Sequence, residues 1–579
     1  MTSDKDGLSI MFSNKENVNI LTSLLVAHGI TTAVVCPGSR NVPIVHNLNE
    51  CGSIRCVPIT DERSAGFVAL GMAQATGMPV AVCVTSGSAL LNLAPAVAEA
   101  FYQHQPLVII SADRPAAWID QLDGQTLPQG DALGRFVRKA VTLPEPHDGT
   151  ECWHCNRLVN EALCQCTHRQ PAPVHINVPI TEPLFEFNVE ALPQERTFKM
   201  LPTETGNNRC ETLEAAWAAS HRPMLVLGQM KDGTVDKEAL NDLVRHAVVL
   251  CEPLGIGQGA THFDEVLFAI GDDTSLMPDL VIYVGGTIVS KRLRHFLRQA
   301  KAATYIITTD ARATPDPTMW LSGIVECDRP DSLRQLLGSL AKARSNTTSL
   351  GKTDLAKGEF ARRWHDALAA AEEIASCYEP QYSQMAAVKY FEEQVGDLEY
   401  NFEVHYANSS AVRLGNIYAT HYVWCNRGVN GIEGSLSTAA GFSMATNDKV
   451  FCIIGDLSFL YDQNALWNSS LRGNLRIMLL NNHCGGIFHQ LHGLEQSPAR
   501  DTMVAAYHQT DAQGICTQND IGYMKAGNMQ EMQLGIVTLL TRQANRPMVL
   551  EITTNAEEDK QAIQEYYKQL RNILANRDE

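Results

Sequence analysis

The sequence has no run of 18 apolar residues, so we expect no helix that spans a bilayer. It also has no surplus of positive charge, because 46 Lys and Arg residues stand against 64 Asp and Glu residues, a formal net charge of −18. That balance disfavours nucleic acid and anionic lipid as partners. Residues Met1–Asp6 lack the basic start and apolar centre of a secretory signal, so we expect a cytoplasmic protein whose partners are small molecules.

Disulfides are not expected, although the chain contains 16 cysteines. Most of them lie in apolar segments such as AVCVTS and VFCIIGD, where a thiol acts as a small buried hydrophobe. The cluster in ECWHCNRLVNEALCQCTHRQ (151–170) could suggest a metal site, but its intervals depart from zinc patterns. Its apolar residues fall at helical spacing, so we predict a helix there and no metal.

The chain is long enough, at 579 residues, for three or four domains. Short apolar runs alternate with helical stretches in three successive series, a pattern that predicts parallel sheets covered by helices on both faces. We therefore expect an α/β protein of three doubly wound domains, at residues 1–190, 205–345 and 360–579. A linker is expected at 184–209, and the polar stretch KARSNTTSLGKTD (342–354) marks the second boundary.

Two apolar runs of the third series end in polar residues that suit a metal. VFCIIG (450–455) is followed by Asp456, and LRIMLL (475–480) is followed by two asparagines, the second of which is Asn482. Ligands of doubly wound sheets bind beyond the carboxyl ends of the strands, where these side chains can converge. Carboxylate and amide oxygens suit Mg²⁺, and a helix beginning near Ser458 would favour an anion such as diphosphate at its amino end. The alternative is ordinary loop capping.

The interval between these residues resembles that of thiamin diphosphate enzymes. Gly455-Asp456-Leu457, 24 further residues and then Asn482 is similar to that family's Gly-Asp-Gly motif followed by Asn, with Leu457 in place of the last Gly. The resemblance implies thiamin diphosphate and Mg²⁺, or Mn²⁺, as cofactors. It implies cofactor binding by Asp456, Leu457, Ser458 and Asn482, and a metal held by Asp456, Asn482 and the backbone carbonyl of Cys484.

Thiamin diphosphate also requires an acid. Its aminopyrimidine becomes a base only when a carboxyl group hydrogen-bonds the distal ring nitrogen. Glu62, at the start of the predicted helix in ITDERSAGFVALGMAQATG (59–77), resembles that catalytic Glu, although a Glu at a helix start can also simply favour the helix dipole. Glu62 and Asp456 lie in different predicted domains, so the cofactor lies between domains. By resemblance two subunits supply them, which implies a homodimer or a dimer of dimers.

Further motifs resemble the 2-succinyl-5-enolpyruvyl-6-hydroxy-3-cyclohexene-1-carboxylate synthases of menaquinone biosynthesis. They include CPGSRNVPIV (36–45), NSSAVRLGN (408–416) and NRGVNGIEGSLSTAAG (426–441). That family decarboxylates 2-oxoglutarate and adds the succinyl carbanion equivalent to isochorismate in Stetter fashion. Both substrates are dicarboxylates, so their pocket needs several cations, and the arginine fork suits carboxylates best.

The resemblance, transferred position by position, implies a substrate pocket built from all three domains. Its expected ligands are Ser39, Arg40, Gln125, Lys291, Arg292, Ser409, Arg413, Arg427 and Phe488. Ser409 and Ile432 are also expected at the cofactor, Ile432 as the apolar wedge that bends it. Each arginine could instead form a surface ion pair, and Ile432 and Phe488 could be core residues.

Two other functions stay open from the sequence. One is another thiamin diphosphate-dependent decarboxylase or carboligase, such as an acetohydroxyacid synthase; its flavin-carrying members need a nucleotide site in the middle domain, and the sequence shows no convincing one. The other is a scaffold or sensor that binds the cofactor without chemistry, although such a protein has no need of Glu62. Arg114, in SADRP, could bind a regulatory product, with strand-end capping as the more usual role.

Overall fold

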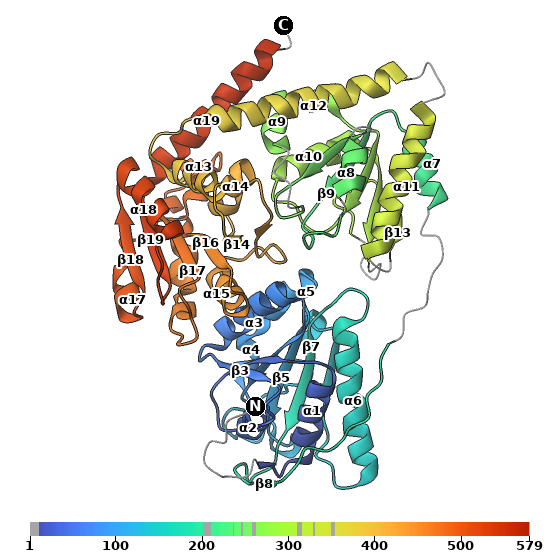
Figure 1. Cartoon of the computed structure of the whole chain (residues 1–579), viewed down its shortest axis with the longest axis vertical. Coiled ribbons are helices and arrows are strands. Elements are labelled where there is room, and N and C mark those ends of the chain that lie inside the picture. The colour runs from blue at the N-terminus through green and yellow to red at the C-terminus, as the bar shows by residue number, and fades with distance from the viewer. Residues whose placement is uncertain are drawn as a thin grey trace.

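The structure is a computed structural model that describes residues 11–200, 210–235, 237–244, 247–256, 262–271, 273–309, 315–327, 330–348 and 354–577. Three separate parallel sheets, each covered by helices on both faces, follow one another along the chain (Figure 1). The predicted α/β architecture of three doubly wound sheets is confirmed. The end of the expected linker (201–209) and part of the expected second boundary (349–353) lie outside the described residues.

The first sheet has six strands in the order β3-β2-β4-β5-β7-β6. The strands are β2 (Thr32–Val35), β3 (Arg55–Pro58), β4 (Val80–Val84), β5 (Leu107–Asp113), β6 (Lys139–Thr142) and β7 (Val174–Pro179). The helices are α1 (Glu16–Ala27), α2 (Val42–Glu50), α3 (Glu62–Thr76), α4 (Ser88–Asn92), α5 (Ala94–Tyr102) and α6 (Gly149–Thr167). A short antiparallel pair, β1 (Phe12–Ser13) with β8 (Phe187–Val189), lies beside this sheet. Helix α6 confirms the helix predicted around the cysteine cluster, and its cysteines are free thiols.

The middle sheet has five strands in the order β10-β9-β11-β12-β13. The strands are β9 (Pro223–Leu227), β10 (Val248–Cys251), β11 (Leu280–Val284), β12 (Ala303–Thr308) and β13 (Leu321–Glu326). The helices are α7 (Glu211–Ala219), α8 (Lys237–Val244), α9 (Phe263–Ile270), α10 (Lys291–Ala300) and α11 (Pro330–Thr348). The three strands β9, β10 and β11 are apolar over their whole length, as parallel strands covered on both faces should be.

The third sheet has six strands in the order β15-β14-β16-β17-β19-β18. The strands are β14 (Phe402–Tyr406), β15 (Val423–Trp424), β16 (Lys449–Gly455), β17 (Leu475–Asn481), β18 (Gly522–Ala526) and β19 (Met548–Thr553). The helices are α12 (Asp354–Cys377), α13 (Gln384–Val395), α14 (Ser410–Tyr418), α15 (Ser435–Ala445), α16 (Asp456–Tyr461), α17 (Gln513–Gln518), α18 (Met529–Thr541) and α19 (Ala556–Arg577). None of the described helices is both long and apolar enough to cross a membrane.

The first and third sheets meet through α3 and α15, which cross between them (Figure 1). The crossing is close because each helix places a glycine at the contact. A Cβ atom on Gly71 of α3 would overlap the backbone carbonyl of Thr438, and one on Gly441 of α15 would overlap the carbonyl of Val68. The apolar core is continuous across this contact, so α3 is fixed against the third sheet.

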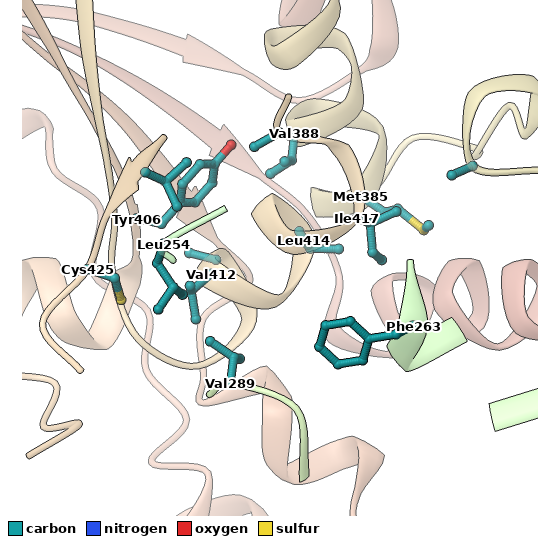
Figure 2. Packing of buried hydrophobic residues seen from close by; sticks show 14 of the residues in the cluster. Leu254, Phe263, Val289, Met385, Val388, Tyr406, Val412, Leu414, Ile417 and Cys425 are labelled. Carbon is teal, nitrogen blue, oxygen red and sulfur yellow. The ribbon is translucent and has the colours of Figure 1, made fainter. Parts of the chain in front are cut away.

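The middle and third sheets also share one core. Figure 2 shows Leu254, Phe263 and Val289 of the middle part facing Val412 and other side chains of the third part. Helix α12 packs on both α9 of the middle part and α19 of the third. The third part therefore contacts both of the others, and the polar residues at its strand ends lie near two domain boundaries.

Candidate functional site

Three polar residues follow adjacent strands of the third sheet at their carboxyl ends. Ser409 follows β14, Asp456 follows β16 directly, and Asn482 follows β17. Strands β16 and β17 are paired as far as Gly455 and Leu480, so Asp456 and the asparagine pair leave the sheet side by side. Asp456 and Asn482 are 4% and 5% exposed, which is unusual for such polar groups unless they are paired or ligate a cation. Asp456 and Asn482 therefore lie at neighbouring strand ends, as the predicted convergence requires.

Asp456 is the first residue of α16, which begins two residues earlier than the sequence suggested. Its Oδ1 accepts the backbone N–H of Leu457 at 2.7 Å, and its Oδ2 lies 3.2 Å from Nε2 of His508. The backbone N–H of Thr510 donates to Nδ1 of His508 at 3.1 Å. That bond places the ring proton of neutral His508 on Nε2, so the imidazole donates to Asp456. His508 is not among the site residues predicted from the sequence.

Asn482 is held by a carboxylate on α19. Its Nδ2 donates to Oδ2 of Asp559 at 3.1 Å, which turns its amide oxygen the other way, toward the thiol of Cys484 at 3.8 Å. Burial raises the pKa of Asp559 to about 6, although its hydrogen bonds oppose the change. At neutral pH Asp559 is therefore an acceptor for the Asn482 amide group.

The turn after Asn482 presents a backbone carbonyl. His483 has a φ of 64°, a left-handed conformation that costs a non-glycine residue about 1 kcal/mol or more. Its N–H donates to Oδ1 of Asn481 at 2.9 Å, and its carbonyl accepts the N–H of His508 at 2.9 Å. The carbonyl of Cys484 accepts the N–H of Gly486 at 2.9 Å and keeps a second lone pair.

The ligand expected at Cys484 is the backbone carbonyl, and the thiol side chain adds no further ligand. Burial, together with Asp456 and Asp559, raises the pKa of its thiol to about 12, so it stays protonated. The remaining donors are a carboxylate, an amide oxygen and a backbone carbonyl, all hard oxygen atoms of the kind that Mg²⁺ binds. The residues present at the strand ends therefore fit the metal and diphosphate that the motif implies.

Apolar side chains lie beside these candidate metal ligands. The hydroxyl of Ser458 donates to the carbonyl of Ile432 at 2.5 Å, which ties the 426–434 loop to the start of α16. Ile432 itself is 42% exposed, so it is not a core residue in this chain. A Cβ on Gly485 would lie 2.8 Å from the ring of Phe488 and 3.4 Å from Leu457, so both side chains pack close to this glycine.

Glu62 is the first residue of α3, as predicted, and its side chain is partly exposed. Its Oε2 accepts Nδ2 of the exposed Asn92 at 3.1 Å. Its two neighbours face the third part instead, since Asp61 accepts Nδ2 of Asn464 at 2.7 Å and Arg63 donates to the carbonyl of Tyr461 at 2.8 Å. Among the described residues of one chain, no hydrogen bond or ion pair joins Glu62 to Asp456 or Asn482.

Three of the expected cations gather where the middle and third parts meet. Arg427 is 7% exposed, donates from Nη1 to Oδ1 of Asn408 at 3.0 Å, and has a buried Nε with no partner among the described residues. Burial and the nearby charge of Arg427 lower the pKa of Arg413, against the opposing effect of Asp264. Arg292 forms an ion pair with Asp264 and lies over the ring of Phe268 at 5.1 Å.

The other expected substrate residues are placed differently. Arg40 is buried, donating to the carbonyl of Ile180 at 3.0 Å and forming an ion pair with Glu182 at 2.9 Å. Ser39, Gln125 and Lys291 are exposed. Arg114 donates from Nε to the carbonyl of Gly124 at 3.2 Å, beside Gln125. Each chain therefore carries two groups of expected substrate residues, one on the first sheet and one between the middle and third parts.

The loop that carries Arg427 belongs to the third part and forms hydrogen bonds with residues of the first and middle parts. Glu99 of α5 accepts the backbone N–H groups of Gly428 and Val429, both at 2.6 Å. Gln229, after β9, donates to the carbonyl of Cys425 at 2.9 Å. Burial raises the pKa of Glu99, which the two backbone donors oppose. The loop therefore has a fixed place at the junction of all three parts.

Glu252, directly after β10, is a further buried acid that the sequence analysis missed. Its two oxygens accept the N–H groups of Val289 at 2.7 Å and Ser290 at 2.9 Å, just before α10 begins with Lys291. Burial raises its pKa to about 7; Arg427 acts in the opposite direction and Asp264 in the same one. Glu252 thus fixes the start of the helix that carries Lys291 and Arg292.

The raised pKa of Glu252 predicts a pH-dependent stability. The folded chain holds the carboxyl proton of Glu252 to higher pH than the unfolded chain does. The stability that this proton contributes is therefore lost as pH rises from about 4.5 to about 7. We expect wild type to lose about 3 kcal/mol over this range relative to Glu252→Gln, which cannot ionise. The measurement is the difference in melting temperature between the two proteins from pH 5 to pH 8. A constant difference across that range would contradict the prediction.

Comparison with known proteins agrees with this geometry. The sequence model of the thiamine pyrophosphate enzyme N-terminal TPP binding domain matches residues 16–133, and that of the C-terminal TPP binding domain matches residues 408–552. An X-ray structure of a candidate thiamin diphosphate-dependent enzyme from Mycobacterium smegmatis superposes with a TM-score of 0.67 at 17% identity, over 93% of this chain and 99% of that one. The chain therefore has the fold and the two TPP binding domains of a thiamin diphosphate-dependent enzyme.

Relatives of similar length define the group more narrowly. The 2-succinyl-5-enolpyruvyl-6-hydroxy-3-cyclohexene-1-carboxylate synthases of Bacteroides fragilis and Bacteroides thetaiotaomicron are each 40% identical to it, over 97% of this chain and 100% of the relative. The synthase of Porphyromonas gingivalis is 33% identical over 96% of this chain and 97% of its own. The chain belongs to this synthase family.

Proposed function

We propose that the protein decarboxylates 2-oxoglutarate with thiamin diphosphate and joins the remaining four-carbon unit to isochorismate by a Stetter-type addition. The product is 2-succinyl-5-enolpyruvyl-6-hydroxy-3-cyclohexene-1-carboxylate, for menaquinone biosynthesis. One observation carries the proposal: the third part of the chain has both buried oxygen ligands and a pair of arginines. The oxygen ligands are on Asp456 and Asn482, and the arginines are Arg413 and Arg427. The first set suits a metal diphosphate, and the second suits a dicarboxylate.

Different residues would bind the metal, the diphosphate and the aminopyrimidine of the cofactor. Asp456, Asn482 and the carbonyl of Cys484 would hold Mg²⁺ or Mn²⁺, with Ser409, Leu457 and Ser458 beside the diphosphate. Thiamin diphosphate, when bound, supplies the electron sink for breaking and forming the carbon–carbon bonds. Glu62 would share a proton with the distal ring nitrogen of the aminopyrimidine.

The proposed substrate residues have two roles: the cations bind substrate carboxylates, and the apolar side chains exclude water. The guanidinium groups of Arg413, Arg427 and Arg292 would bind substrate carboxylates, while Ile432 and Phe488 would exclude water. The set on the first sheet would supply its ligands from the partner subunit. Its members are Ser39, Arg40 and Gln125, and Lys291 would add a cation from the start of α10 in the middle part.

We also propose a homodimer, or a dimer of such dimers, as the working form. Around Glu62 the chain exposes large apolar side chains, with Leu91, Tyr461 and Trp467 between 45% and 64% exposed. A second copy would cover them and would bring its own Asp456 and Asn482 to Glu62. We further propose domains at 1–190, 205–345 and 360–579, each built on one of the three large parallel sheets, and a cytoplasmic location, which the free thiols suit.

The test combines purified protein, Mg²⁺, thiamin diphosphate, 2-oxoglutarate and isochorismate generated in place by an isochorismate synthase. We expect isochorismate consumption that requires every component. Decarboxylation of pyruvate with isochorismate untouched would assign the protein to the other carboligases. Cofactor binding without any turnover would favour a scaffold or sensor.

Arg413→Gln tests the arginine pair. Loss of a charge-assisted hydrogen bond of about 1.5–3 kcal/mol should raise KM for 2-oxoglutarate about 10- to 100-fold, with kcat changed only a few-fold. The matched control is Arg362→Gln, since Arg362 forms an exposed ion pair with Asp366 on α12. Equal KM values for Arg413→Gln and wild type would exclude Arg413 as a substrate ligand.

A further inference from the structure

The strongest unassigned arrangement is the carboxylate behind Asn482. Asp559, in the first turn of α19, is 7% exposed and its side chain accepts three hydrogen bonds. Its Oδ1 accepts the backbone N–H of Gln384 at 2.8 Å. Its Oδ2 accepts the hydroxyl of Thr554 at 2.8 Å and Nδ2 of Asn482 at 3.1 Å. A carboxylate in this position can only accept, so each of its partners must present a donor.

That constraint decides which way the Asn482 amide faces. An asparagine has a donor end and an acceptor end of nearly the same shape, and only the acceptor end can ligate a metal. With the NH₂ group fixed on Asp559, Oδ1 faces the opposite side, where the turn to Cys484 begins. Gly486 packs so closely against this amide that a Cβ there would overlap Nδ2, which leaves little room for the group to turn over.

We propose that Asp559 is a positioning residue, which orients the amide of Asn482 so that its oxygen faces the metal of the cofactor. The inference rests on the proposed metal site and adds a residue to it from the C-terminal helix. Partners that orient a metal ligand typically change metal affinity by about 10- to 100-fold when they are replaced. Asp559 does not touch the metal itself, so its effect should act through Asn482.

The test measures Mn²⁺ binding to the full-length protein with saturating thiamin diphosphate and no substrate, from the electron paramagnetic resonance signal of free Mn²⁺. We expect Asp559→Asn to weaken Mn²⁺ binding about 10- to 100-fold, because its new NH₂ group faces either the Asn482 amide or the Gln384 N–H. Thr554→Val is the matched control: it removes another donor to Asp559 and leaves the Asn482 bond, so Mn²⁺ affinity should stay within about threefold.

A second variant separates orientation from folding. A carboxylate at position 482 presents an oxygen on both sides, and the amide that Asp559→Asn introduces can donate to it. Adding Asn482→Asp to Asp559→Asn should therefore bring Mn²⁺ affinity back to within about threefold of wild type. Unchanged affinity in Asp559→Asn, or no recovery in the double variant, would overturn the role of Asp559. Failure of wild type to bind Mn²⁺ would instead overturn the metal site itself.

Discussion

Glu62→Gln is expected to lower kcat by about 10²- to 10⁴-fold, the range by which a positioned acid or base accelerates a reaction. Gln keeps the shape of Glu62 and its bond from Asn92 but has no carboxyl proton to share with the aminopyrimidine. Cofactor affinity, followed by fluorescence quenching, should change only a few-fold, since in the proposed site Asp456 and Asn482 would hold the other end of the cofactor. A kcat within tenfold of wild type would exclude the catalytic role.

A matched control addresses the helix-dipole alternative. Glu16 is likewise the first residue of a helix, α1, and lies outside the site, so Glu16→Gln removes a comparable charge from a helix start. We expect it to leave kcat unchanged. A similar loss in both variants would mean that the effect comes from the helix and not from the cofactor.

Mixed dimers test where the two halves of the site come from. If one subunit supplies Glu62 and the other Asp456, a dimer of one Glu62→Gln and one Asp456→Ala subunit has one intact site and one doubly defective site. Such dimers, purified through two different tags, should show about half of the wild-type activity, although each variant alone is expected to keep at most about 1% of it. No activity in the mixed dimer would place both residues of a site on one chain.

Gly441→Ala is expected to destabilise the protein by about 3 kcal/mol or more. The added Cβ would overlap the backbone carbonyl of Val68, and because neither helix backbone can rotate out of the way, α3 and α15 must separate. Gly71→Ala should act alike through the carbonyl of Thr438. The measurement is calorimetric unfolding, in which the transition that includes the first and third sheets should shift to lower temperature.

The control is a glycine on an open helix face. Among the described residues, no atom would lie within 4 Å of a Cβ on Gly338 of α11, so Gly338→Ala should be neutral or should stabilise the protein by up to about 1 kcal/mol. Equal effects at positions 338 and 441 would mean that close approach of α3 and α15 is not what requires glycine. Because α3 begins with Glu62, we also expect Gly441→Ala to lower activity more than Gly338→Ala.

Three strands of the large sheets were not anticipated from the sequence pattern. They are β6, β15 and β18, and each lies at the edge of its sheet. An edge strand buries less apolar surface, as the mostly accessible GYMKA of β18 illustrates, so its sequence carries little of the continuous apolar signal of a covered strand. The strands that precede Ser409, Asp456 and Asn482 are interior, which is why the sequence could place these candidate ligands at strand ends.

The sequence by itself determined the fold class, the cofactor motif at Asp456 and Asn482, and the helix-start position of Glu62. These depend on local spacing, and strand ends of a parallel sheet always share an edge. Only the tertiary structure revealed His508, Glu252 and Asp559, which come from loops and from a charged helix start without a distinctive pattern. Their roles arise from burial beside residues that are distant in sequence, where the cost of desolvation favours polar groups that find a partner.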